Sequence, residues 1–543
     1  MPPVEANQSV PNSEGTYVNK SNDLQRLNRF LCSGTEKGPV CVRDHTQELG
    51  PQNVGCVNRL LADGQGEEVV TEVESFSKNG RVARQDTSVL VLAMCARLGD
   101  DRTKRRAYDA FPRVCRIPTH LFQFVELCEN LNMTAGAGSG WGRAHRRAIR
   151  RWYQRFQDKP LRLAQHVTKY RKRKGWCHVD VLRLAHPKPR SDSVNVVLRY
   201  VTKGLPAAVG VFPPQDGVPV EIVTTLSFLK AVEEVKRLGN NPDDVQRVCA
   251  AIREHNLVRE HVPTQMLNSI DVWKALLINM PLTAMIRHLG KMSSMNMLGT
   301  GSEAAQLVVE KLHNEAALKY ARIHPFNLLL SMLVYNQGHG ELGSLTWRAN
   351  ADIVKAMDDA FYLSFKYVEP TGKRYCLAVD VSGSMTSPVT GSSAMNAREA
   401  AAALSMVTAC SEQQCEVVGF SDTLVHLPIN PHMLLTDVVN VISDVPVGVT
   451  DCSAPILWAM RENKKFDVFI VYTASETAQG HVPAADALPE YRRHSGIHNA
   501  KLIVCAFASN GFTIADPNDP GMLDMAGFDS NSPAIMNTFI TEM

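Results

Sequence analysis

One carboxylate and two hydroxyls follow one another at two-residue intervals in Asp380-Val-Ser382-Gly-Ser384. They come directly after the run Tyr375-Cys-Leu-Ala-Val379, which is short and apolar as a buried strand would be. Loops at the carboxyl ends of parallel strands meet in one crevice, and hard oxygen ligands suit Mg²⁺. The motif therefore predicts a divalent-cation site. The same residues leave an alternative open, in which Ser382 and Ser384 cap a following helix.

The spacing resembles the metal-ion-dependent adhesion site of von Willebrand factor A domains, a family that also uses a threonine from a later loop. Thr450, within Gly448-Val-Thr-Asp-Cys-Ser453, occupies the matching position. Where the family's fourth strand commonly ends in Thr-Asp, this chain has Thr473-Ala474, and Glu476 is either a substitute or a solvated loop residue. The missing carboxylate predicts weak occupancy by Mg²⁺. The predicted ligands are Asp380, Ser382, Ser384 and Thr450.

A second chemistry is indicated by an arginine-rich segment at residues 141–156. At helical spacing, Ile149, Trp152 and Phe156 fall within one arc and are expected in the core. The opposite side carries a row of guanidinium groups, which bind phosphate oxygens in a bidentate manner. The segment therefore predicts a phosphate-binding helix, with its row formed by Arg143, Arg146, Arg147, Arg150 and Arg151.

Residues 167–189 supply a second basic patch. Lys169 and Arg173 are four residues apart, which makes them neighbours on a predicted helix that Gly175 would end. His186 precedes Pro187 in a turn context, where it could stack on a base or contact phosphate. The alternative is that it is an ordinary histidine at a helix end. Trp152 and Trp176 are interpreted as core residues. The predicted phosphate-binding residues here are Lys169, Arg171, Lys172, Arg173, Lys174 and His186.

Helical periodicity dominates as far as about residue 365 and positions these basic residues. Connectors rich in Gly and Pro interrupt it at residues 134–142, 204–220, 239–243 and 338–343. Residues 269–292 predict an antiparallel helix pair, with Pro281 in the first turn of the second helix and Gly290 at its end. Similar pairs at 223–260 and 303–335 suggest an α-solenoid of HEAT type.

The pattern changes near residue 370. Short apolar, β-branched runs, separated by stretches of helical length, indicate buried parallel strands with crossover helices. The C-terminal part is therefore predicted to be a doubly wound α/β domain. Its predicted strands are residues 375–380, 415–420, 467–472 and 501–506.

Length and composition narrow the class of protein. The 543 residues predict about three or four core units. The thirteen cysteines are scattered and lack CxxC spacing, which predicts reduced thiols and a cytosolic setting. No apolar run is long enough to span a bilayer, so a soluble protein is expected. The net charge of +3 conceals 23 basic against 7 acidic residues at 101–200, whereas 371–543 has 9 against 18. That asymmetry indicates a nucleic-acid partner.

The whole chain resembles the Ro autoantigen family of ribonucleoproteins, in which a TROVE module precedes a von Willebrand A domain. The resemblance is carried by Leu27–Cys32, Cys115–Phe122, 167–189, Val258–His261, Val272–Leu277, Met280–Thr283, Ala321–Phe326, Asp380–Met385 and Gly511–Pro517. It implies a disordered segment at 1–20, a TROVE module at 21–369 and an A domain at 370–543. The family's fold implies HEAT-like helical pairs closed into a ring by the A domain.

The same resemblance implies the RNA ligands. An outer basic surface that includes Lys169, Arg173 and His186 is expected to bind Y RNAs. A central hole is expected to take single-stranded 3′ ends of misfolded noncoding RNAs, with Lys203, Arg287 and His288 as its basic residues. The expected roles are noncoding RNA quality control and Y RNA stabilisation, in the cytoplasm and with the extent of nuclear entry left open.

The sequence bears on two other classes of function. An enzyme is not expected, because the sequence has no GxxxxGK[ST], HExxH or GxSxG motif. The second class is a metal-dependent adaptor that binds proteins through the A domain. In that case the basic charge of the helical half has no role in function. Nucleic acid that copurifies at low salt would indicate the RNA-binding protein, because the adaptor is expected to purify without it.

Overall fold

The computed structural model describes residues 9–11, 17–19, 22–36, 40–41, 48–79, 82, 84–134, 141–211, 218–239, 241–340, 343–390, 392–421, 424–430, 432–446, 448, 450–474, 482–508 and 514–542. These residues form two compact units. The helical unit comprises Val57–Asn79 and Gln85–Leu307. The sheet unit comprises Met1–Cys56, Gly80–Arg84 and Val308–Met543.

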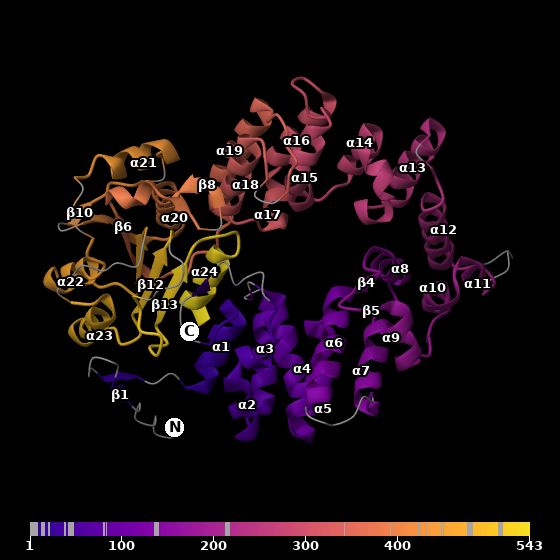
Figure 1. The fold of residues 1–543 in the computed structure, drawn as a ribbon, viewed down its shortest axis with the longest axis horizontal. Coiled ribbons are helices and arrows are strands. Elements are labelled where there is room, and N and C mark those ends of the chain that lie inside the picture. The colour runs from indigo at the N-terminus through magenta and orange to yellow at the C-terminus, as the bar shows by residue number, and fades with distance from the viewer. Residues whose placement is uncertain are drawn as a thin grey trace. The chain divides into compact units, whose positions relative to one another are not determined.

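The first helices of the helical unit stack side by side (Figure 1). Side-chain caps set several helix starts; Asp100, for example, accepts a hydrogen bond of 2.7 Å from the Thr103 amide at the start of α5. The predicted break at 134–142 is confirmed, because α6 ends at Thr134 and α7 begins at Arg143. The stack consists of α3 (Gly66–Asn79), α4 (Gln85–Leu98), α5 (Asp101–Val114), α6 (Pro118–Thr134) and α7 (Arg143–Gln154), after α2 (Gly55–Ala62).

The helices continue to the end of the unit, broken by short turns and one two-stranded hairpin. The predicted helix pairs at 223–260 and 269–292 are present, whereas residues 303–335 belong to three helices and not to a pair, and the 204–220 connector contains a short helix, α11. The elements are α8 (Pro160–Lys169), β4 (Lys172–Arg173), β5 (Trp176–Cys177), α9 (His178–Ala185), α10 (Asp192–Lys203), α11 (Leu205–Val209), α12 (Val220–Val235), α13 (Pro242–His255), the 3₁₀ turns η3 (Arg259–His261) and η4 (Thr264–Asn268), α14 (Ile270–Ile278) and α15 (Leu282–Ser294).

The prediction that Gly290 ends α15 is wrong. The helix continues to Ser294, because Met292 is fully buried and that packing offsets the cost of a glycine inside a helix, about 1 kcal/mol. Asn296, with φ of 57°, takes the left-handed conformation after the helix end instead.

The sheet unit contains a seven-stranded sheet in the order β10-β9-β6-β11-β12-β13-β3, parallel except for the β10 edge. All four predicted strands are confirmed. The strands are β6 (Arg374–Asp380), β9 (Gln414–Phe420), β10 (Leu424–His426), β11 (Val468–Thr473), β12 (Lys501–Ala506), β13 (Met522–Ala526) and β3 (Val40–Cys41).

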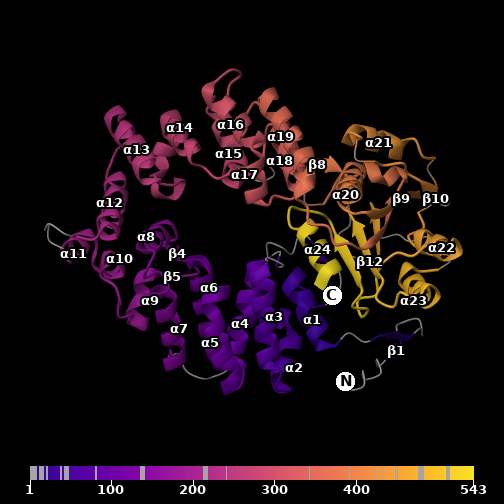
Figure 2. The ribbon, with the colours of Figure 1, turned by 180° about the vertical axis from the view of Figure 1, so that it is seen from behind.

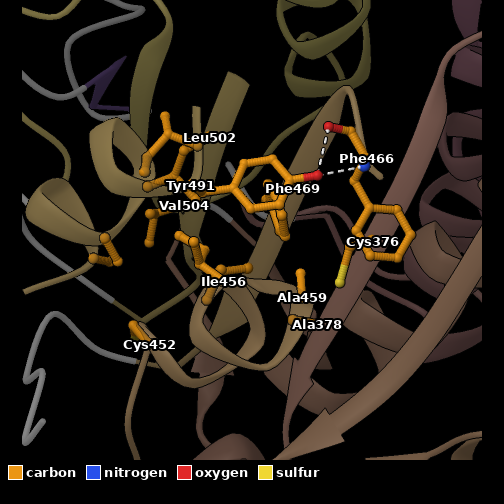
Figure 3. Close-up of a cluster of buried hydrophobic side chains, with 14 of the residues drawn as sticks. Cys376, Ala378, Cys452, Ile456, Ala459, Phe466, Phe469, Tyr491, Leu502 and Val504 are labelled. Carbon is orange, nitrogen blue, oxygen red and sulfur yellow. Dashed lines mark hydrogen bonds between the residues drawn. The ribbon is translucent and has the colours of Figure 1, made fainter. Parts of the chain in front are cut away.

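Helices cover both faces of this sheet, as expected for a doubly wound domain. Phe469 and Val471 of β11 pack against α22 (Ala454–Arg461) and α23 (Ala484–Ser495). In this core the Tyr491 hydroxyl accepts a 2.6 Å hydrogen bond from the Phe466 amide (Figure 3). Ile470 and Tyr472 face α20 (Ala397–Ser411) and α24 (Ser532–Glu542) instead.

The N-terminal segment contributes to the sheet unit. Helix α1 (Asp23–Ser33) packs against α24, and β3 pairs with β13 at the sheet edge. The buried Arg29 donates a hydrogen bond of 2.9 Å to the Met522 carbonyl. The first twenty residues, expected to be disordered, lie mostly outside the described residues; two short strands, β1 (Ser9–Pro11) and β2 (Tyr17–Asn19), pair within them.

The remaining helices of this unit either precede β6 in sequence or lie within the A domain. They are α17 (Glu315–Ala321), α18 (Pro325–Gln337), α19 (Ala351–Leu363) and, within the A domain, α21 (Leu435–Ser443), whereas α16 (Glu303–His313) crosses the unit boundary. No disulfide joins any of the cysteines in the part of the chain that the structure describes. No helix in the described part of the chain is long and apolar enough to cross a membrane. Closure of the helical pairs into a ring stays a prediction.

Candidate RNA-binding surface and metal crevice

The four predicted metal ligands meet at the carboxyl ends of β6 and β11. Asp380 ends β6 and is 1% exposed. Its Oδ1 accepts a hydrogen bond of 2.8 Å from the Ser382 amide, which fixes the loop that follows the strand. The hydroxyls of Ser382 and Ser384 lie 2.7 Å apart, and the Thr450 hydroxyl is 3.4 Å from both carboxylate oxygens.

The capping alternative for the serines receives no support from the geometry. The residues after Ser382 form only a 3₁₀ turn, Gly383–Thr386, and the Ser382 side chain makes no capping hydrogen bond there. Its hydroxyl contacts Ser384 instead. The two hydroxyls therefore lie together on the loop that the Asp380 carboxylate fixes, and both remain available as hard oxygen ligands.

Thr473 belongs to this crevice and was missed by the sequence-based set. Its hydroxyl donates a hydrogen bond of 2.8 Å to Asp380 Oδ2, and the residue is 1% exposed. The pairing of Tyr472 with Val379 brings Thr473 beside Asp380, and this register between two distant strands is set by the fold and not by any local motif. Burial and nearby carboxylates, Asp380 among them, raise the pKa of Cys452 to about 12, so this thiol stays protonated beside the crevice.

The donor set fits Mg²⁺ in kind but supplies a single carboxylate. Ala474 is buried and carries no ligand atom, and Glu476 lies outside the described residues. Within the described ranges, no cluster of three or more His, Cys, Asp or Glu side chains could hold a metal. Mg²⁺ is often bound through one or two carboxylates while it keeps several waters. Asp380, Ser382, Ser384 and Thr450 are therefore the residues that would hold it.

The arginine helix is present as α7. Ile149, Trp152 and Phe156 are buried, as predicted, and the Trp152 indole donates a hydrogen bond to the Cys115 carbonyl. Arg143, Arg146 and Arg147 are exposed. Arg150 donates to the Ala185 carbonyl, and Arg151 forms an ion pair of 2.6 Å with Asp109. The row is therefore exposed at its N-terminal end and held to neighbouring elements at its C-terminal end.

The predicted helix through Arg173 is wrong. Helix α8 ends at Lys169, and β4 and β5 form a hairpin whose turn is Lys174-Gly175. Both turn residues have positive φ, 52° and 79°, as a type I′ turn requires, and glycine adopts that conformation without strain. Arg171, Lys172 and Arg173 are consequently exposed on an extended segment and not along a helix.

His186 lies beside the arginine row. It ends α9 in the left-handed conformation, with φ of 48°, and its side chain is exposed. The hydrogen bond from Arg150 Nε to the carbonyl of Ala185, the preceding residue, joins the two elements. Lys169 is near a different element, because its ammonium group is 3.7 Å from Glu260 of η3. The predicted basic residues thus lie near at least two different elements of one unit, the end of α9 and η3.

The three residues assigned to a central hole do not form one cluster. Lys203 is exposed in the last turn of α10, and Arg287 is exposed on α15. His288 is half-buried with its ring 5.3 Å from that of Trp273, and burial lowers its pKa. No contact in the described part of the unit joins Lys203 to the pair on α15.

Known proteins match the chain almost end to end. A model of the TROVE domain matches residues 10–332, and a model of the Ro60 vWA domain matches residues 374–540. A Caenorhabditis elegans relative named RNA-binding protein RO60 is 37% identical over 585 aligned residues, with 98% of this chain and 90% of the relative covered. A Deinococcus radiodurans protein of the same name is 34% identical, with 98% and 95% covered. The chain belongs to the Ro60 family.

The fold supports the same assignment. The crystal structure of the Deinococcus radiodurans RO (RSR) protein superimposes with a TM-score of 0.81 at 33% identity, covering 96% of this chain and 99% of that one. The Ro60 TROVE match contains every candidate basic residue, and the Ro60 vWA match contains Asp380, Ser382, Ser384 and Thr450. The family predicted from the sequence is therefore confirmed.

Proposed function

We propose that this chain binds RNA through its helical unit and is the protein component of a small cytoplasmic ribonucleoprotein. The observation that carries the proposal is the set of exposed Lys and Arg side chains on α7 and on the β4–β5 hairpin, together with the exposed His186, within one unit. Arginine and lysine side chains in such numbers release counterions from phosphates when they bind. The names of two relatives, RNA-binding protein RO60, support the same ligand class.

The proposal extends to two kinds of RNA. Y RNAs, which are small and structured, would bind the surface formed by Lys169, Arg171, Lys172, Arg173, Lys174 and His186. Single-stranded 3′ ends of misfolded noncoding RNAs would bind near Lys203, Arg287 and His288, which is the step that serves RNA quality control. The chain acts by binding and not by catalysis. The A domain would hold Mg²⁺ weakly through Asp380, Ser382, Ser384 and Thr450, beside a surface for protein partners.

A triple variant tests the separation of the two RNA sites. Lys169→Gln, Arg173→Gln and His186→Gln together should abolish binding of a structured small RNA and largely spare a single-stranded 3′ end. The control is Arg113→Gln with Arg247→Gln, which removes two exposed guanidinium groups that are already paired, with Glu74 and Glu234. Binding is measured by fluorescence anisotropy with both RNAs.

The outcomes separate the proposal from its alternatives. Equal loss of both RNAs, with circular dichroism unchanged, would mean one continuous site. Unchanged binding of the structured RNA would place its site elsewhere. Failure of the wild-type chain to bind either RNA at low salt would favour the protein-binding adaptor and sink the proposed function.

A further inference from the structure

A small cavity lies inside the sheet unit, between the sheet and two of the helices that cover it. Figure 2 shows α20 and α24 on one side of the sheet, opposite α22 and α23. The cavity between the sheet, α20 and α24 has a volume of about 70 Å³ and is partly open to solvent. Its walls are mostly buried apolar side chains, which include Leu404, Val407, Ile470, Pro533, Met536 and Ile540.

The Tyr472 side chain lines this cavity, and its hydroxyl is unpaired. Tyr472 is 0% exposed, and the hydroxyl has no hydrogen-bond partner among the residues that the structure describes. The Thr408 hydroxyl approaches it but donates its own proton to the Leu404 carbonyl, 2.9 Å away. Burial raises the pKa of Tyr472 well above its ordinary value, so the hydroxyl keeps its proton. A ligand oxygen that accepted this hydrogen bond would satisfy a buried donor that is otherwise costly.

The surroundings of Tyr472 suit a water molecule poorly. A buried water usually makes about three hydrogen bonds to polar groups. The hydroxyls of Tyr375 and Thr371, which also line the cavity, lie 2.6 Å apart, and Thr371 Oγ1 donates to Glu412 at 2.8 Å. These groups already have partners, and the walls next to Tyr472 are apolar. An oxygen that carries an apolar group therefore fits better than a water.

The charges around the cavity favour a neutral ligand. His324 Nδ1 accepts a hydrogen bond of 3.2 Å from the Phe326 amide, and burial lowers the pKa of His324 to about 4, so its ring is uncharged near pH 7. None of the described residues that line the cavity is Lys or Arg, so no cation would hold an anion there. The Glu412 carboxylate already accepts three hydrogen bonds, from Thr371 and Gly372. A charged ligand would also lose its hydration among the apolar walls.

The volume limits the size of the ligand. An apolar cavity of about 150 Å³ can hold benzene, so about 70 Å³ has room for about three or four non-hydrogen atoms. Short alcohols and ketones combine that size with one oxygen that accepts hydrogen bonds.

We propose that this cavity binds a small neutral alcohol or ketone, whose oxygen accepts a hydrogen bond from the Tyr472 hydroxyl and whose short aliphatic body packs against Leu404, Ile470 and Met536. The site goes beyond the proposed function, because it involves neither RNA nor the predicted metal ligands. Its failure would leave the proposal of RNA binding intact.

Acetone is the probe, because its oxygen accepts hydrogen bonds and it donates none. The full chain with ¹³C-labelled methionine methyl groups is titrated with acetone, and the Met536 methyl resonance reports on the cavity. Met385 is the control, because it is fully buried in the turn after Asp380 and does not line the cavity. Each resonance is assigned with its Met→Leu variant. We expect a saturable shift of Met536 and not of Met385, with a dissociation constant on the order of millimolar.

Two matched variants test the role of the hydroxyl. Tyr472→Phe keeps the ring and the cavity, and acetone should bind it roughly fivefold to tenfold more weakly. Tyr491→Phe is the control, because Tyr491 is equally buried but lies on the other side of the sheet, where its hydroxyl accepts from the Phe466 amide. Acetone should bind this control as it binds the wild type.

Thermal unfolding without acetone gives a second readout. Tyr472→Phe removes an unpaired polar group, so its midpoint should equal or exceed that of the wild type, whereas Tyr491→Phe loses a hydrogen bond and should unfold at a lower temperature. A Met536 resonance that moves no more than that of Met385 overturns the proposal. Equal acetone affinity in Tyr472→Phe and the wild type overturns recognition through the hydroxyl. A lower midpoint in Tyr472→Phe shows that the hydroxyl is paired, which overturns the premise of the site.

Discussion

The ammonium group of Lys169 lies 3.7 Å from the carboxylate of Glu260. Both side chains are partly exposed, at 32% and 43%, so water screens their attraction. An exposed pair of this kind contributes at most about 1 kcal/mol, yet the carboxylate competes directly with any phosphate that approaches Lys169.

Replacing Glu260 with Gln should therefore tighten RNA binding. We expect a twofold to fivefold gain, about 0.4–1 kcal/mol, for a structured small RNA at low salt, and a smaller gain as salt rises. Anisotropy titrations of the Glu260→Gln variant measure it, with Glu254→Gln as a control on the neighbouring helix. Weaker binding in the variant would mean that Glu260 positions Lys169 for RNA instead of competing with it.

The Mg²⁺ affinity of the metal crevice should increase when a second carboxylate is introduced. Ala474→Asp places a second carboxylate beside Asp380, and we expect tighter Mg²⁺ binding by roughly 1–3 kcal/mol. Calorimetric titration of the full chain with Mg²⁺ measures the change, and Ala474→Asn controls for size without charge. An Mg²⁺ affinity in Ala474→Asp no greater than in the wild type would show that the crevice is not a cation site.

Arg29 should be required for the stability of the sheet unit. Its guanidinium group is buried, bonds the Met522 carbonyl and lies near the carboxylates of Asp524 and Asp519. Arg29→Met removes the hydrogen bond to the Met522 carbonyl and the positive charge near the buried Asp524 carboxylate, at an expected cost of about 2–4 kcal/mol in the free energy of unfolding. Chemical denaturation followed by tyrosine and tryptophan fluorescence measures the loss. An unchanged midpoint would show that α1 is only loosely attached.

Stability should fall in mild acid because buried histidines are held neutral. Burial lowers the pKa of His178 to about 3 and that of His261 to about 4, below the ordinary 6.5. Below pH 6.5 these histidines are therefore protonated in the unfolded chain but stay neutral in the folded chain. Their contribution to the free energy of unfolding is largest above pH 6.5 and is lost as the pH falls. From pH 6.5 to 5 each histidine contributes a loss of about 2 kcal/mol.

Thermal unfolding midpoints at pH 7.5, 6.5 and 5 test this decline. In the native chain, His261 Nδ1 accepts from the Val258 amide and Nε2 donates to the Thr168 hydroxyl. His261→Asn removes one titrating group, so its midpoint should fall less steeply with pH even if it starts lower. An identical slope in the variant and the wild type would contradict the assignment.

The sequence predicted most of this architecture because the strong signals are local. The apolar β-branched runs identified the four central strands, and the 100° periodicity of 141–156 separated buried Trp152 from exposed Arg147. Features that depend on packing between elements were harder to predict from the sequence. Burial of Met292 overrode Gly290 as a helix end, and the turn at Lys174-Gly175 replaced a predicted helix because glycine fits either role.

Long-range partners account for the other omissions. Thr473 reaches Asp380 through the pairing of β11 with β6, and Arg29 reaches Met522 across 493 residues of sequence. Charge counting identified a basic region at 101–200 but could not distinguish Arg113, which is paired with Glu74, from Arg105, which is not. Only the packing of α3, α5 and α7 separates these two arginines.

The salt dependence of RNA affinity tests the central claim, RNA binding through phosphate contacts on the helical unit, most directly. Each neutralised phosphate should contribute a slope of roughly −0.7 to −0.9 to a plot of log affinity against log salt concentration. For a structured small RNA titrated between about 50 and 200 mM salt, we expect several contacts and hence a steep line. The control with Arg113→Gln and Arg247→Gln should keep that slope, whereas the variant lacking Lys169, Arg173 and His186 should not bind this RNA at any salt concentration in the series. A slope near zero for the wild-type chain would contradict the account.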